Sequence, residues 1–119
     1  MQKMKIKLNR SEQEALLRIL LNYDVSVVTS VMERQMIIHL AGDVTRRLAT
    51  HVSDNLEAKP WMLKLNRGEA AALWAIFWHV DYVGYAATLS QKILYAIHNY
   101  FTNIEMQARF VAAQNKQLT

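Results

Sequence analysis

The chain has 119 residues, of which 52% are apolar, one is proline, three are glycine and none is cysteine. This composition excludes a disordered chain and favours one folded domain spanning residues 1–119. The lack of cysteine excludes disulfides and thiolate metal sites, and predicts a cytoplasmic location. Fourteen basic against ten acidic residues give a formal charge of +4, which is a modest excess for a nucleic-acid-binding protein.

The first residues of the chain are basic and lack the apolar run of an export signal. Three lysines, Lys3, Lys5 and Lys7, occur there with no acidic residue beside them. Apolar and lysine residues alternate over 4–8, and a similar alternation recurs over 61–65. These two segments are therefore an alternative pair of short strands in a chain that otherwise reads as helical.

An internal repeat relates the two halves of the chain. Shifted by 57 residues, the sequence KLNRSE at 7–12 aligns with KLNRGE at 64–69, and eight of thirteen aligned positions are identical. We interpret this as a duplicated unit, with copies at about 4–55 and 61–115. The polar, proline-containing segment 53–60 separates the copies.

The shared segment predicts where one helix of each copy begins. Asn9 and Asn66 are favourable N-cap residues, and Glu12 and Glu69 follow three positions later, where a carboxylate can accept from the cap amide. The same reasoning predicts a second helix in each copy, beginning near Ser30 and near Thr88, after loops at 24–29 and 81–87. Four amphipathic helices predict an all-α fold, a four-helix bundle made of two tandem helical hairpins.

The predicted third helix lacks the polar face of its counterpart in the first copy. Polar residues at 14, 18 and 22 are replaced by Ala71, Ala75 and His79, and Trp78 replaces a leucine. Such a helix is either covered on several sides within the core or used as a contact surface. The second interpretation predicts an interface of Ala71, Ala75, Trp78 and His79, and hence a homodimer or a protein partner.

Residue groupings typical of catalysis, metal binding and nucleotide binding are not evident in the sequence. His39 and Asp43 share a helix face and His98 lies further on, but no third ligand accompanies them. The three glycines are isolated from one another, so no phosphate-binding loop is predicted. We therefore expect no enzymatic activity, no cofactor and no metal. Residues 70–78, the most apolar stretch, are too short to cross a membrane.

Two functions remain. The preferred one is a non-enzymatic interaction or scaffold module that self-associates through the third helix. The alternative is a small nucleic-acid-associated protein, whose contacts would come from the basic N-terminal arm of Lys3, Lys5 and Lys7 and from Arg46 and Arg47. The apolar face supports the first function, and the local clusters of positive charge support the second.

Overall fold

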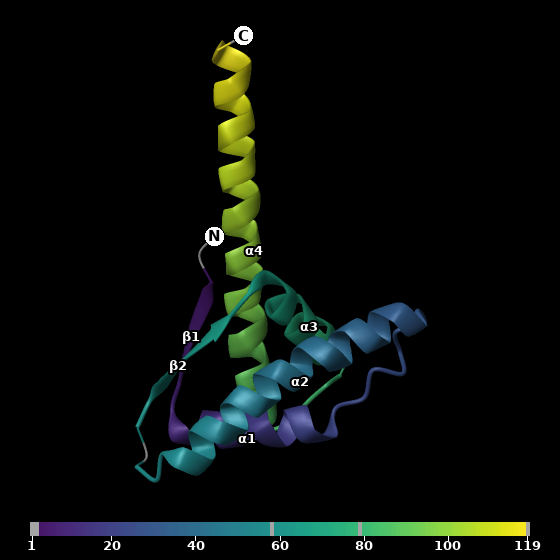
Figure 1. Ribbon diagram of the computed structural model, residues 1–119, viewed down its shortest axis with the longest axis vertical. Helices are drawn as coiled ribbons and strands as arrows, with labels where there is room; N and C mark the ends of the chain where they lie inside the picture. The colour runs from purple at the N-terminus through teal and green to yellow at the C-terminus, as the bar shows by residue number, and fades with distance from the viewer. Residues whose placement is uncertain (1–2, 58, 79, 119) are drawn as a thin grey trace.

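The computed structural model describes residues 3–57, 59–78 and 80–118, and shows a strand followed by two helices, twice over (Figure 1). The elements in chain order are β1 (Met4–Leu8), α1 (Arg10–Asn22), α2 (Val31–Asp54), β2 (Trp61–Leu65), α3 (Arg67–Trp78) and α4 (Tyr85–Leu118). The two halves of the repeat therefore have the same order of elements.

The predicted all-α bundle of two tandem hairpins is wrong. Residues 4–8 and 61–65, which the sequence offered as alternative strands, form a two-stranded antiparallel sheet, called the ribbon below. The helices also do not form two separate hairpins, since α2 packs on α3 and α4 contacts α1. Each second helix thus contacts the first helices of both halves, and the two halves share one core.

The register of the ribbon follows the internal repeat. Ile6 pairs with Leu63, its equivalent 57 residues later, and Met4 pairs with Leu65 while Leu8 pairs with Trp61. The offset of 57 residues maps Met4 onto Trp61 and Leu8 onto Leu65, so it converts the pair of Met4 and Leu65 into the pair of Trp61 and Leu8. The strands are therefore related by an approximate two-fold axis through the pair of Ile6 and Leu63.

The core lies between one face of the ribbon and the helices. In β1 the apolar residues are buried and the lysines exposed, as expected for a strand with one face on a core. The buried set draws on all six elements and includes Leu8, Leu16, Leu48, Leu63, Leu65, Leu73, Ile76, Phe77, Leu89, Ile93 and Ile97. Burial of these side chains provides the main favourable free energy of folding.

The predicted starts of α1 and α3 are confirmed in atomic detail. The Asn9 side chain accepts from the Glu12 amide at 2.8 Å, while the Glu12 carboxylate accepts from the Asn9 amide at 2.9 Å. Asn66 and Glu69 repeat both hydrogen bonds, at 2.7 and 2.9 Å. Each capping box stabilises its helix by about 1 kcal/mol.

The second helices follow the prediction less closely. Ser30 caps α2 by accepting from the Glu33 amide, as expected. However, α4 begins at Tyr85 rather than near Thr88, after Gly84, whose φ of 64° suits a residue without a side chain. The predicted loop at 81–87 is therefore too long. Both second helices extend beyond the core, α2 at its N-terminal end and α4 at its C-terminal end (Figure 1).

Candidate nucleic-acid interface

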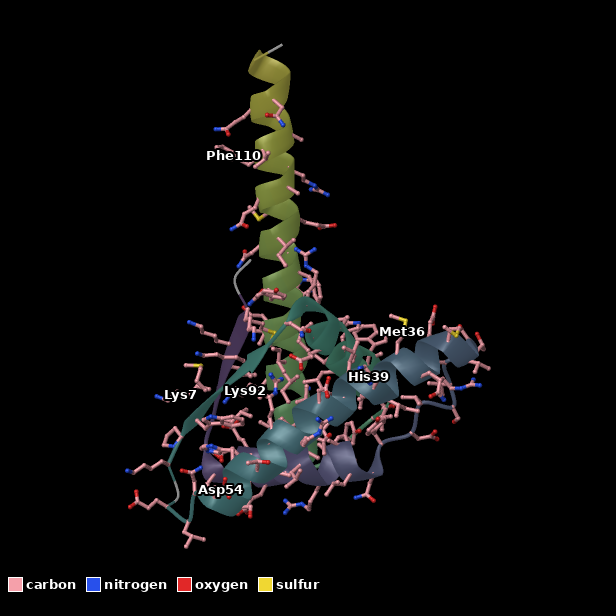
Figure 2. The ribbon with its side chains drawn as sticks, in the orientation of Figure 1. Lys7, Met36, His39, Asp54, Lys92 and Phe110 are labelled. Atoms are coloured by element: carbon pink, nitrogen blue, oxygen red, sulfur yellow. The ribbon has the colours of Figure 1, made fainter. Side chains whose placement is uncertain are left out.

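The outer face of the ribbon carries exposed lysines. Because side chains alternate along a strand, Lys5 and Lys7 of β1 and Met62 and Lys64 of β2 point away from the core, and all four are exposed. Lys3, which directly precedes β1, is also exposed and continues this alternation. Figure 2 shows Lys7 extending away from the helices. The side chains of this face are free to contact a partner.

The positive charge of this face is not compensated by the protein. Lys5 lies directly opposite Lys64 in the ribbon, an arrangement that destabilises an antiparallel pair. Neither strand contains an acidic residue. Within the described part of the chain, Lys3, Lys5, Lys7 and Lys64 form no ion pair. An anionic partner would relieve the repulsion between these lysines.

This face also accounts for the net charge of the whole protein. The chain has fourteen basic and ten acidic residues. Four lysines on this face carry as many charges as the formal excess of +4, namely Lys3, which precedes β1, and Lys5, Lys7 and Lys64 of the ribbon. The ten basic residues elsewhere equal the acidic residues in number. The lysines of this face therefore form a local group of positive charge in a chain that is otherwise balanced in number.

Each capping-box glutamate also forms an ion pair with a helix of the other half. At the end of β1, Lys92 of α4 donates to the Glu12 carboxylate at 2.8 Å and to the Lys7 carbonyl oxygen at 2.8 Å. At the end of β2, Arg47 of α2 donates to the Glu69 carboxylate at 2.9 Å. In both cases the carboxylate of the capping box binds a helix from the other half. Lys92 also binds the backbone of β1, so this ion pair connects α4 to the ribbon.

The environment of Glu12 makes the protein sensitive to acid. Burial opposes ionisation of this carboxyl, but hydrogen bonds from Lys92 and from the Asn9 amide, with the charge of Lys92, outweigh it and lower its pKa. A lowered pKa in the folded state stabilises the fold above the unfolded value of 4.5, and this stability is lost as the pH falls through the folded pKa.

We therefore expect Glu12→Gln to make the free energy of unfolding less dependent on pH below about 4.5. The variant should be less stable than the wild type at neutral pH and approach it in acid. Urea denaturation at a series of pH values measures this. A constant difference between the two proteins down to pH 2 would contradict the role of the ionised carboxylate.

Arg46 and Arg47 differ from the ribbon lysines because both form ion pairs within the protein. Arg46 donates to Asp43 at 2.8 Å, and Arg47 is the residue paired with Glu69, so both charges have acidic partners. They line a shallow groove between α2 and β2 together with His51, whose ring stacks on Trp61 at a centroid distance of 4.0 Å. These two arginines are a less direct candidate for nucleic-acid contact than the ribbon.

The predicted contact surface on α3 is only partly exposed. Trp78 is 62% exposed and stacks on Trp74, with ring centroids 5.1 Å apart. Ala71 is exposed and Ala75 is half-buried, whereas His79 lies outside the described residues. Beside them is an open pocket of about 210 Å³, which is lined by Ala71, Trp74, His98 and Phe101. The surface thus has an apolar character without being a continuous apolar face.

Sequence reasoning missed the contribution of the second strand to the basic face. Lys64 and Met62 become part of it only because β2 pairs with β1, and the alternation over 61–65 was the available signal. Among the described residues, no group of three or more His, Cys, Asp or Glu side chains is placed to hold a metal ion. None of the helices in the described ranges has the length and apolar character needed to cross a membrane.

Comparison with protein-family models, curated proteins and solved structures gives no match for this chain. The function therefore has to be inferred from the chemistry of its own surfaces. The outer face of the ribbon and the exposed part of α3 are two surfaces that point to a partner.

Proposed function

We propose that this protein binds double-stranded DNA through the outer face of the ribbon. The observation that carries the proposal is that the outer face of the ribbon bears four exposed lysines without acidic partners among the described residues, and that two of them, Lys5 and Lys64, lie opposite each other on a two-stranded antiparallel sheet. A polyanion would release this repulsion, and lysine donates to phosphate oxygens without reference to sequence. Nucleic-acid binding was the alternative function predicted from the sequence.

The shape of the ribbon favours duplex DNA over other nucleic acids. The major groove of B-form DNA is wide enough to admit a two-stranded β-ribbon, whose outward side chains can then reach base edges. The major groove of an RNA duplex is deep and narrow, so side chains cannot read it. Single strands are usually bound by stacking on aromatic rings, and the outer face carries lysines and Met62 instead.

A salt titration tests the proposal. Binding of the full chain to a labelled DNA duplex should weaken linearly in a plot of log affinity against log salt concentration, with a slope of about −0.9 for each phosphate contact. Lys7→Gln and Lys64→Gln should each weaken binding and make this slope shallower, because each removes a positive charge from the bound face. Arg109→Gln removes the same charge from the exposed far part of α4 and is the matched control.

The slope should not change in the Arg109→Gln control. If all three variants change the affinity equally, binding depends on net charge and not on the ribbon. If a duplex does not bind even at low salt, the proposed function is wrong. A competing RNA duplex that binds as tightly as DNA would also contradict insertion into a major groove.

Self-association through α3 is a second candidate function. It is supported by the exposed Trp78, which stacks on the half-buried Trp74, because an exposed tryptophan is a typical anchor of a protein interface. The occupant we propose is a second copy of this chain, since symmetric pairs are the commonest assembly. This surface and the ribbon involve different elements, so the two functions are compatible.

Ala71→Glu tests this candidate, because Ala71 is exposed and a charge there should leave the fold intact. Light scattering after size-exclusion chromatography is expected to show a dimer for the wild type and a monomer for the variant, with equal helix content. Glu14→Gln, at the position equivalent to Ala71 in α1, is a control that should leave the dimer unchanged. A monomeric wild type at high concentration would rule out this function.

A further inference from the structure

We infer that the ribbon reads a DNA site whose two halves differ, so that the preferred sequence is not a palindrome. This inference rests on the proposed binding of duplex DNA. It concerns the specificity of the same face, and it follows from how the internal repeat has diverged at the residues that point outward.

The backbone of the ribbon provides a nearly symmetric frame. Ile6 pairs with its own repeat equivalent, Leu63, and the flanking pairs are exchanged by the repeat. Duplex DNA has two-fold symmetry of its backbone, so a symmetric reader placed in its groove presents equivalent side chains to the two half-sites. In a dimer of identical chains, both half-sites would meet identical residues. Here both strands belong to one chain and are free to differ.

The outward residues break this symmetry at two of three positions. Lys7 and its equivalent Lys64 are identical. Lys5, however, corresponds to Met62, and Lys3 corresponds to Pro60. The inward residues keep their apolar character throughout, since the core requires it. Residues differ on both faces, but the change from charged to uncharged is confined to the face that would meet DNA.

The difference divides the ribbon into two chemically distinct ends. At one end Lys5 lies opposite Lys64, with Lys3 next along the chain. At the other end Lys7 lies opposite Met62, which is 43% exposed. The first end offers amino groups only, whereas the second combines one amino group with an apolar, flexible thioether side chain.

These ends fit different bases. A lysine in the major groove donates to O6 and N7 of guanine. The side chain of Met62 cannot donate a hydrogen bond, but it can pack on the C5-methyl group of thymine. We therefore expect a guanine-rich half-site beneath Lys5 and Lys64, and a half-site with thymine at the position that Met62 contacts.

Selection from a pool of duplexes with random centres tests the inference. The wild type should enrich a motif without two-fold symmetry. In the Met62→Lys variant, the half-site at that end should change from thymine to guanine, with a preference of roughly fivefold or more. The motif should thereby become more nearly palindromic. Met106→Lys adds the same charge at an exposed methionine of α4 and should leave the motif unchanged.

The outcomes separate this inference from the proposed function. A wild-type motif with two-fold symmetry within the segment that one ribbon contacts, or a Met62→Lys motif identical to that of the wild type, would overturn the inference while leaving DNA binding in place. Salt-sensitive binding without any enriched motif would do the same. Failure of the wild type to retain duplexes at low salt would instead overturn the proposed function itself.

Discussion

Replacing Lys5 by glutamate is expected to make the protein more stable and its binding to duplex DNA weaker. Lys5 faces Lys64 across the ribbon, so the substitution exchanges a repulsive cross-strand pair for an attractive one. Such a pair contributes about 0.2–1 kcal/mol to stability. Binding should fall about tenfold or more, because one lysine contact is lost and a negative charge is brought to the phosphates. A residue retained for folding alone would not show these opposite effects.

Lys7→Glu is the matched control for this prediction. Lys7 faces Met62 rather than a lysine, so its substitution should weaken DNA binding without stabilising the fold. Urea denaturation gives the stability of each variant, and fluorescence anisotropy with a labelled duplex gives the affinity. If Lys5→Glu leaves the affinity unchanged, or lowers stability, the ribbon lysines are not held in place for an anionic partner.

Phe77→Ala is expected to cause the largest loss of stability of any single change considered. Phe77 is 1% exposed, lies in the shared core and contacts the Tyr82 ring, with centroids 5.7 Å apart. Truncating a buried phenylalanine to alanine costs about 3–5 kcal/mol, because apolar contacts are lost and a cavity remains. A domain of this size has a total stability of about 5–15 kcal/mol.

The same substitution at an exposed phenylalanine provides the control. Phe110 is 63% exposed on the part of α4 that extends beyond the core (Figure 2). Phe110→Ala should therefore change the free energy of unfolding by less than about 0.5 kcal/mol. Thermal and urea denaturation measure both variants. Equal losses in the two would show that the far part of α4 is packed in solution.

The duplicated helix starts could be predicted from sequence because their physical cause is local. An asparagine followed three residues later by glutamate specifies a capping box wherever it occurs, and both copies in this chain form one. The repeat also correctly assigned equivalent roles to Glu12 and Glu69. Local chemistry does not reveal that each carboxylate also binds a cation from the other half.

The ribbon and the packing of α2 and α4 against both halves depend on contacts that are distant in sequence. Segments 4–8 and 61–65 are too short for periodicity alone to decide between strand and loop, and pairing is what makes them strands. The prediction of two separate hairpins failed because amphipathic stripes show that α2 and α4 need partners without showing which helix each one covers. The contribution of Met62 and Lys64 to the basic face likewise depends on the pairing of β2 with β1.

The most direct test of DNA binding by the ribbon is an NMR titration of the ¹⁵N-labelled full chain with a short duplex. We predict that the largest amide shift changes occur in residues 3–8 and 61–66, with small changes in the part of α4 beyond the core. Changes concentrated on α3, around Trp74 and Trp78, or no changes at low salt, would contradict the proposed role of the ribbon.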